Sequence, residues 1–412
     1  MLGKQLFSLF TAAALLCAFS GCSNSADSVA PESASAETEV PEMRDITTTE
    51  LVQDMGIGIN LGNTFESCGD WIEQWGDGSV ESYETAWGSP VITQEMIAGY
   101  AAEGFGVLRI PVAWSNLMAP DYTISPEYLK RVMQVTDWAM DTGMYVIVNI
   151  HYDGGWFADF STQKDTCMQK YTRIWEQLSD AFQDYNDHLM LESLNEEGCW
   201  DDIWNRYSGD DSQKKEVYDL LLEINQTFVD TVRASGGNNA KRHLLIAGYA
   251  TDIDLTCDEL FRMPEDPENR MAVSVHYYAP AGFAILEEDA DWGKARPQWG
   301  SPREQRELAY NLDKMTKAFS AKGIPVIIGE YGCPKKNKEE DSVRLYLSSV
   351  CREASARGFC PILWDVTDSH YDRTTCKMTD PQLKTDLFQA AEEGRETFRS
   401  GTADSTAAED KI

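Results

Sequence analysis

Residues 144–151 read MYVIVNIH, an apolar run rich in β-branched residues that ends in a histidine. A run of this length is typical of a strand buried on both faces. A helical pattern precedes it, beginning at Ser125-Pro126 and ending at Gly143. Serine as the capping residue, proline in the first turn and glycine at the stop each take their usual places. The segment is therefore interpreted as a helix that leads into a buried strand.

The same alternation of short apolar runs and longer helical patterns recurs from about residue 50 onward. The candidate strands lie at 55–62, 106–112, 144–151, 188–195, 243–249, 271–278, 325–331 and 359–366. Alternating strands and helices indicate βα units, and eight such units close into a barrel. We therefore predict an α/β fold, a (β/α)8 TIM barrel forming a single catalytic domain.

Further start and stop signals support this division into elements. Ser301-Pro302 with Glu304 forms a capping box, and Gly323 stops that helix just before the seventh strand. The fifth unit is the least regular, because the segment 250–270 contains two prolines and shows only a short helical pattern.

The ends of the chain differ from its middle. Residues 1–22 combine one basic residue, an apolar stretch and a small-residue ending at Cys22, which is the form of an export signal. The ending resembles a bacterial lipobox, so Cys22 is the expected lipidation site of a cell-surface lipoprotein, with ordinary secretion as the alternative. Residues 23–43 predict a disordered acidic linker, 44–399 the catalytic domain and 400–412 a flexible tail.

Charge and cysteine content narrow the possible partners. Lys and Arg number 35 against 68 Asp and Glu, a net charge of −33. Such a surface repels nucleic acid and anionic lipid, so we expect no nucleic-acid partner and membrane contact only through the lipid anchor. A neutral glycan escapes this repulsion. The cysteines beyond Cys22 include no Cys-x-x-Cys pair of the kind that binds zinc, and we expect mostly buried thiols.

Polar residues gather where the predicted strands end, which is the side on which barrels of this kind carry their active sites. These residues are Arg109, His151, Asn195, Glu196, His276, Tyr278, Glu330 and Trp364. Each alone has an ordinary structural explanation, and two histidines with carboxylates could also bind a metal ion, although we expect none. Because these residues occur together at the ends of six predicted strands, we interpret them as a catalytic site. Glu196 and Glu330, on nearly opposite strands, form the carboxyl pair that glycoside hydrolysis requires.

The motifs around these residues resemble glycoside hydrolase family 5, a family of retaining (β/α)8 enzymes. The resemblance rests on GINLGNTFES at 58–67, ETAWGSPV at 84–91, LRIPVAW at 108–114, VNIHYDGGW at 148–156, LESLNE at 191–196, HYY at 276–278, IIGEYG at 327–332 and LWD at 363–365. It implies that Glu196 is the acid/base and Glu330 the nucleophile, without a cofactor. It also implies a sugar-binding shell made of Arg109, His151, Asn195, His276, Tyr278 and Trp364.

One departure from the family concerns the residue after the acid/base. Many members continue as Asn-Glu-Pro, whereas Glu197 and Gly198 follow Glu196 here. A second carboxylate pointing inward would raise the pKa of Glu196, but we expect Glu197 to point to solvent. We further expect burial to keep Glu196 protonated, and Arg109 and Tyr278 to keep Glu330 ionised.

The predicted substrate is plant cell-wall β-1,4-glucan, cellulose-type or mixed-linkage, because the GNTFES and ETAWG segments resemble the endoglucanase branches. Endo-β-mannanase or xyloglucanase activity on the same scaffold is the alternative, and a noncatalytic glycan-binding surface lipoprotein is a remote one. We expect a monomer with an open cleft suited to endo cleavage. Tryptophans expected in the loops around this cleft, about half of them in the core, are Trp71, Trp75, Trp87, Trp114, Trp156, Trp200, Trp292 and Trp299.

Overall fold

The structure is a computed structural model that describes residues 43–401 except residue 199. Eight parallel strands form a closed barrel, in which β1 pairs with both β2 and β8. The strands are β1 (Gly58–Asn60), β2 (Val107–Ile110), β3 (Tyr145–Asn149), β4 (Leu189–Glu192), β5 (Leu244–Ala247), β6 (Met271–Tyr277), β7 (Val326–Tyr331) and β8 (Cys360–Leu363). Every one lies inside a range predicted from the sequence, so the (β/α)8 barrel is confirmed.

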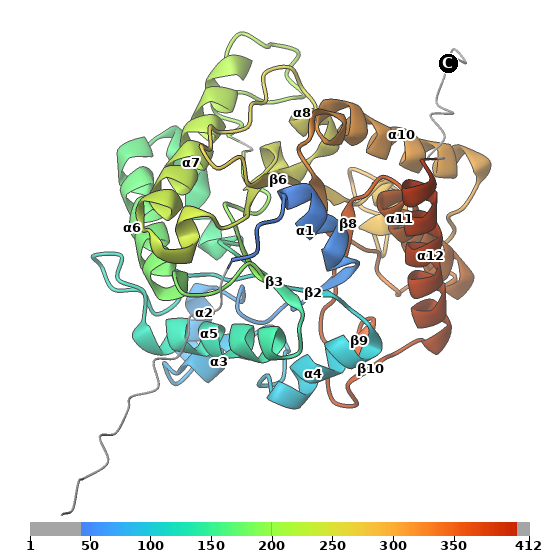
Figure 1. Ribbon diagram of the computed structural model, residues 1–412, viewed down its shortest axis with the longest axis horizontal. Helices are drawn as coiled ribbons and strands as arrows, with labels where there is room; N and C mark the ends of the chain where they lie inside the picture. The colour runs from blue at the N-terminus through green and yellow to red at the C-terminus, as the bar shows by residue number, and fades with distance from the viewer. Residues whose placement is uncertain (1–42, 199, 402–412) are drawn as a thin grey trace, which may run out of the picture. The chain divides into compact units, whose positions relative to one another are not determined.

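Helices surround the barrel (Figure 1). They are α1 (Thr48–Met55), α2 (Asp70–Trp75), α3 (Val80–Glu84), α4 (Gln94–Glu103), α5 (Pro126–Asp141), α6 (Lys164–Phe182), α7 (Lys214–Ala234), α8 (Ile253–Thr256), α9 (Ala281–Ala284), α10 (Pro302–Ala318), α11 (Glu340–Ser355) and α12 (Pro381–Ser400). Short 3-10 helices are η1 (Asp153–Ser161), η2 (Gly237–Ala240), η3 (Tyr249–Thr251) and η4 (Ser320–Lys322), and β9 (Tyr371–Asp372) pairs with β10 (Lys377–Met378) outside the barrel. The fifth unit has only the short α8, as its sequence predicted.

The predicted helix starts are confirmed, but the predicted stop of α10 at Gly323 is wrong, because α10 ends at Ala318 and Gly323 ends the short η4 that follows. The Ser125 side chain accepts a hydrogen bond from the backbone of α5, and Ser301 and Glu304 form the capping box of α10. Gly143 and Gly323 have φ values of 87° and 82°, a left-handed conformation that favours glycine. These signals fix where each helix turns back into a strand.

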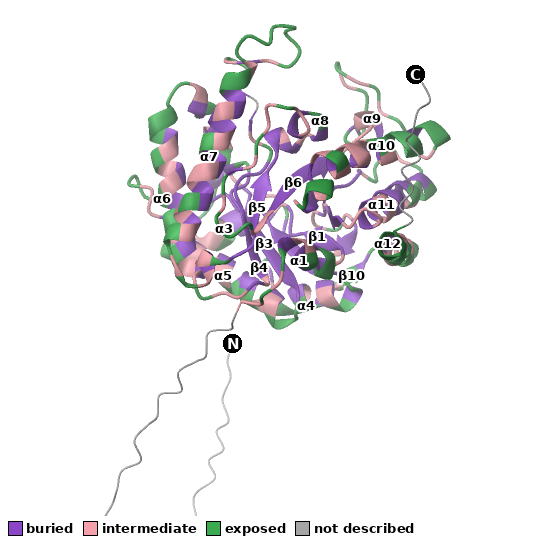
Figure 2. Ribbon diagram, turned by 45° about the horizontal axis from the view of Figure 1, so that its top comes forward, coloured by how far each residue is buried: buried purple, intermediate pink, exposed green. Residues whose placement is uncertain are grey.

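The core has two layers, and the inner one explains which end of the barrel is closed. Leu51, Val52 and Met55 of α1 pack with Ile147, Met190 and other inward-facing strand residues. In Figure 1, α1 lies across the ring of strands, and Figure 2 shows the strands as almost wholly buried. An amphipathic helix thus closes the end at which the strands begin, and the C-terminal ends of the strands remain available for a site.

Several sequence predictions fall outside the described residues, namely the signal and Cys22, nearly all of the linker, and residues 402–412. Within 43–401, residue 199 excepted, no helix has the length and apolar character needed to cross a membrane. Every cysteine in that part of the chain is a free thiol, and Cys167, Cys333, Cys351 and Cys360 are buried. The expectation of mostly buried thiols agrees with this.

Candidate active site

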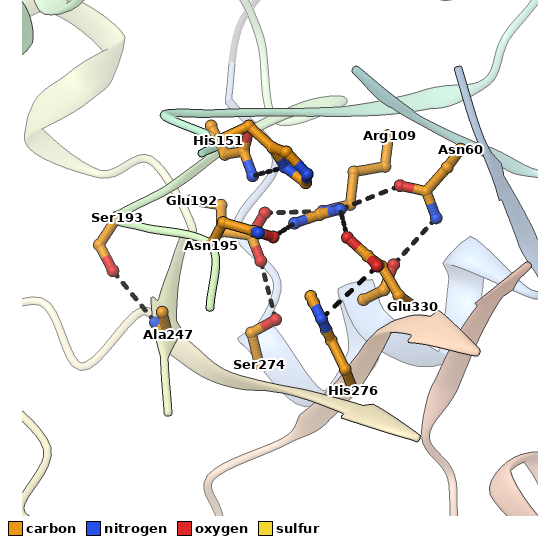
Figure 3. Close-up of polar contacts among 12 residues, drawn as sticks. Asn60, Arg109, His151, Glu192, Ser193, Asn195, Ala247, Ser274, His276 and Glu330 are labelled. Carbon is orange, nitrogen blue, oxygen red and sulfur yellow. Dashed lines mark hydrogen bonds and ion pairs between the residues drawn. The ribbon is translucent and has the colours of Figure 1, made fainter. Parts of the chain in front are cut away.

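Arg109, at the C-terminal end of β2, is the hub of a buried polar network (Figure 3). Its Nε donates to Glu192 at 2.7 Å, and its Nη2 donates to the Asn195 side-chain oxygen at 3.0 Å. Its Nη1 donates both to Asn60 Oδ1 at 3.0 Å and to Glu330 Oε1 at 2.8 Å. The guanidinium has five donors in a fixed plane. It therefore connects β2, which carries Arg109, to β1, β4 and β7, and it orients Glu330.

Glu330 and Glu196 occupy different surroundings. Glu330 lies in β7 with 6% of its side chain exposed, and its Oε2 accepts a hydrogen bond from the Tyr278 hydroxyl at 2.9 Å. Glu196 follows β4, is half exposed, and places Oε1 2.7 Å from His276 Nδ1. One oxygen of each glutamate and a nitrogen of His276 all lie within 4.8 Å of one another. The two carboxyl groups therefore face each other at short range.

A register shift between β6 and β7 brings His276 beside Glu330. The pairing slips after Val275, so that His276 lies opposite Glu330 and Gly329 is passed over. A Cβ on Gly329 would lie 2.9 Å from Ser274 Oγ and 3.1 Å from His276 Nε2. A side chain at this position would therefore press on Ser274 and on the ring of His276, which explains why glycine fits here.

In the site without a bound sugar, the pKa values of Glu196 and Glu330 shift in the directions opposite to those expected from the sequence. Burial raises the pKa of Glu196, but the hydrogen bond and charge of His276 outweigh it and bring this pKa below its usual value. Burial also raises the pKa of Glu330, and there the charges of His276 and Arg109 oppose it only in part. Burial lowers the pKa of His276, but the two glutamates raise it further than burial lowers it. In the free site, His276 thus holds a proton more tightly, and Glu196 less tightly, than either group does in water.

The other predicted residues lie at the same C-terminal end of the barrel, which is called the mouth below. His151 is buried, and burial, followed by the charges of Arg109 and His276, holds its pKa well below the usual value, so it is neutral. The ring of Trp364, just past β8, lies parallel to that of His151 with centroids 5.8 Å apart. The structure thus brings all eight predicted residues together.

Three further residues of the network were missed by sequence reasoning. Ser274 donates to Glu192 Oε1 at 2.8 Å, and the Asn60 amide donates to Gly329 O at 3.0 Å. Glu192, Asn60 and Ser274 are fully buried inside otherwise apolar strands. That position is itself a signal, because a buried polar side chain needs a buried partner.

The prediction that Glu197 points to solvent is wrong. Its side chain is partly buried, and burial raises its pKa to about 8, with the charges of Glu196 and Asp153 adding to the shift. The backbone explains this orientation. Ala250 N donates to Glu197 O at 2.8 Å, and Gly198, with a φ of 130°, packs against Tyr249.

A metal ion is one species that Glu196, His276 and Glu330 could hold by donor type and spacing. The surroundings disfavour it, because Arg109 and Tyr278 already donate to both oxygens of Glu330. A cation there would add a second positive charge beside the buried Arg109 guanidinium, which already donates to the same carboxylate.

The tryptophans divide between the core and the rim. Trp114, Trp200 and Trp299 are buried, whereas Trp71, Trp75 and Trp292 are 47%, 80% and 65% exposed. The exposed three lie in segments that follow the C-terminal ends of β1 and β6, on the same side as the carboxylates.

Comparison with known proteins agrees with this geometry. The family model for cellulase (glycosyl hydrolase family 5) matches residues 69–370. Endoglucanase A of Ruminococcus albus is 36% identical over 328 residues, covering 78% of this chain and 84% of that protein. A xyloglucan-specific endo-β-1,4-glucanase of Bacteroides ovatus is 32% identical over 356 residues, covering 81% and 68%.

Among solved structures, a GH5-4 broad specificity endoglucanase from an uncultured bovine rumen ciliate superposes with a TM-score of 0.76 at 34% identity, covering 84% of this chain and 98% of that one. The part of the chain that matches the family model and these relatives also forms the barrel and carries the two facing carboxyl groups. The chain belongs to glycosyl hydrolase family 5.

Proposed function

We propose that the protein hydrolyses β-1,4-linked glucan by endo cleavage through a double displacement. The observation that carries this is the approach of the Glu196 and Glu330 oxygens to within 4.8 Å. Retaining glycosidases hold their carboxyl groups about 5–5.5 Å apart, and inverting enzymes hold them about 6.5–9.5 Å apart to admit a water. Glu330 attacks the anomeric carbon, while Glu196 gives a proton to the departing glycosidic oxygen. Glu196 then deprotonates the water that releases the sugar from Glu330.

The proton that Glu196 needs is close at hand. The two glutamates raise the pKa of His276, and 2.7 Å separates Nδ1 of the histidine from Oε1 of Glu196. A sugar that fills the mouth excludes water from the half-exposed Glu196, which favours the neutral acid. The proton then crosses from His276 to Glu196, and Glu330 keeps its negative charge beside Arg109.

Asn195 and Trp364 have surfaces that can contact the sugar, and these surfaces suggest their roles. The Asn195 oxygen is engaged by Arg109, so its NH2 group is left to donate to the 2-hydroxyl of the sugar. Such a bond strengthens as oxocarbenium character develops. Trp364 offers an indole face to the pyranose ring, as aromatic side chains do for the apolar faces of sugars.

The proposed substrate is supported by the relatives and by the exposed tryptophans around the barrel mouth. The Ruminococcus albus relative is an endoglucanase, and the rumen ciliate structure is described as broad specificity. The exposed Trp71, Trp75 and Trp292 suit a long chain bound along an open cleft. Xyloglucan is the second candidate, favoured by the Bacteroides ovatus relative. Product sizing on carboxymethylcellulose, barley β-glucan, xyloglucan and glucomannan decides among them, and exclusive release of single sugars would contradict endo cleavage.

The proposed location is the cell surface, with Cys22 as the lipid-bearing residue, supported by the small-residue ending before it. Cys22→Ser should release the protein from membrane fractions without changing its activity. Membrane retention of this variant would contradict lipid anchoring.

The roles of the two glutamates are tested with an aryl glycoside whose leaving group departs without protonation. Glu330→Ala should be nearly inert, because no covalent intermediate forms, and azide should restore activity with an α-linked product. Glu196→Ala should release a burst of phenol and then turn over slowly, because the second step lacks its base. Azide should speed that step and give a β-linked product. The same anomer from both variants would contradict the assigned roles.

A further inference from the structure

Arg373 is a fully buried arginine just beyond β9. Its Nη1 donates to Thr64 Oγ1 at 2.8 Å and to Ser89 Oγ at 2.7 Å, and its Nη2 donates to Gly62 O at 2.7 Å. No carboxylate of the described chain forms an ion pair with it. One guanidinium therefore joins the loop after β1, the segment before α4 and the loop after β8. Burying such a cation is costly, so these contacts must offset a considerable desolvation.

The backbone of Gly62 is held through both of its polar groups, which belong to the two peptides that flank its Cα. Arg373 binds its carbonyl oxygen, and its N–H donates to Asp365 O at 3.0 Å. A Cβ at Gly62 would lie 2.5 Å from Asp365 O and 3.1 Å from Cζ2 of Trp364. The Gly62 backbone is thus the surface against which the Trp364 indole rests. Movement of Gly62 would change the position of this ring.

The charge of Arg373 is balanced at a distance by two buried carboxyls. Burial raises the pKa of Asp365 and of Glu66 to about 7, and the charge of Arg373 opposes both shifts. Asp365 Oδ1 accepts from the His370 backbone at 2.7 Å, whereas its Oδ2 has no hydrogen-bond partner. Lysine cannot reproduce three oxygen contacts spread over a planar group, so the position requires arginine.

We propose that Arg373 is a positioning residue for the sugar at the cleavage point: through Gly62 it fixes the Trp364 ring on which that sugar stacks. The inference rests on the proposed function, since it needs a sugar over Trp364. Arg373 itself touches neither Glu196 nor Glu330, so its effect is on the binding of the sugar ring and not on proton transfer.

The chain offers a matched control in Arg242, immediately before β5. It is also fully buried and without an ion pair in the described chain. Its guanidinium donates to the Leu189 carbonyl at 2.9 Å and the Phe182 carbonyl at 2.7 Å, at the end where the strands begin. Arg242 also donates to Asn239 Oδ1 and to the carbonyls of Asn186 and Tyr185, so Arg242→Lys disturbs a larger set of buried contacts than Arg373→Lys, on the face opposite the carboxylates.

The test is a double-mutant cycle on soluble barley β-glucan, measured well below the unfolding midpoint of every variant. Arg373→Lys should lower kcat/KM about ten-fold, and Arg242→Lys should lower the unfolding midpoint with kcat/KM within about two-fold of wild type. In a Trp364→Ala background, Arg373→Lys should cost less than about two-fold, because its effect acts through that ring. Additive losses, or an equal loss of kcat/KM in Arg242→Lys, would overturn the inference.

A second pair of variants covers a failure of Arg373→Lys to fold. Thr64→Val and Ser89→Ala each remove one oxygen that accepts from Arg373 and keep the arginine in place. Each should show a smaller loss of kcat/KM that also disappears in the Trp364→Ala background, and additivity there overturns the inference equally. Inactivity of the wild-type protein on every β-glucan would instead overturn the proposed function, and this inference with it.

Discussion

Burial, His276 and Arg109 together set the pKa of Glu330, the proposed nucleophile. Arg109 donates to Glu192 at 2.7 Å and to Glu330 at 2.8 Å. The negative charge of Glu192 on the same guanidinium offsets part of the stabilisation that Arg109 gives to Glu330. Burial then prevails at Glu330, whose pKa lies above its usual value.

Glu192→Gln tests this competition. The amide keeps the shape, can accept from Arg109 and can meet Ser274, but it removes one negative charge. Arg109 then acts on Glu330 alone, so the pKa of Glu330 should fall and the acid limb of the kcat/KM profile should move down by roughly one pH unit.

Glu103→Gln is the matched control, because Glu103 is a buried carboxylate paired with Lys377 and Lys384 away from the mouth. It should leave the pH profile unchanged. An acid limb that stays in place or rises in Glu192→Gln would contradict the shared-charge account.

At this scale the sequence predicted which residues meet but not how their protons are distributed. Strand ends identify Arg109, Glu196 and Glu330, because parallel strands must present their ends at one mouth. The reversed pKa directions depend on His276 lying 2.7 Å from Glu196 and 3.7 Å from Glu330. His276 reaches its place opposite Glu330 through a register slip past Gly329, which no pattern of apolar residues reveals.

Among the elements, the strands were predictable and some helix contacts were not. Apolar runs place all eight strands because the burial of both faces leaves a continuous signal. Gly99 inside α4 carries no such explanation in the sequence, since glycine weakens a helix interior by about 1 kcal/mol relative to alanine. The structure supplies the reason: a Cβ there would lie 2.0 Å from the Tyr371 hydroxyl and 2.7 Å from Cys376 Cβ.

Gly99→Ala should therefore destabilise the protein, by about 1–3 kcal/mol as for an overpacked core, although helix propensity alone predicts a gain. Tyr371→Phe in the Gly99→Ala background should recover part of the loss by removing the nearer clashing atom. Denaturant unfolding measures both effects. A more stable Gly99→Ala would show that α4 can move away from β9 and β10 at little cost.

The stability of the whole molecule depends on buried groups that titrate near neutrality. Burial raises the pKa of Glu66 and Asp365 to about 7 and that of Glu197 to about 8. A carboxyl with a raised folded pKa binds its proton more tightly when folded, so stability falls as pH rises from the unfolded to the folded pKa. Burial lowers the pKa of His243 and His370 to about 4, which makes stability rise up to their unfolded pKa of 6.5.

Below pH 6.5 the three carboxyls outweigh the two histidines, and above it His276, whose pKa is raised, adds to the effect of the carboxyls. The unfolding midpoint should therefore fall gently between about pH 5 and 6.5 and more steeply as the pH rises past about 6.5. Thermal unfolding across this range checks it, and Glu197→Gln should make the decline shallower. A midpoint that rises toward pH 8.5 would mean that these carboxyls are hydrated and not buried.

The unequal exposure of the two glutamates decides what else the protein can make. Glu330 is enclosed by the barrel, and half of the Glu196 side chain faces solvent. In the proposed double displacement, a sugar esterified to Glu330 is approached from the side of Glu196, so the same base that would deprotonate water would deprotonate any other hydroxyl that arrives there. Water and the hydroxyl groups of other sugars therefore compete to react with the sugar on Glu330. In concentrated oligosaccharide the enzyme should accordingly lengthen chains as well as cut them.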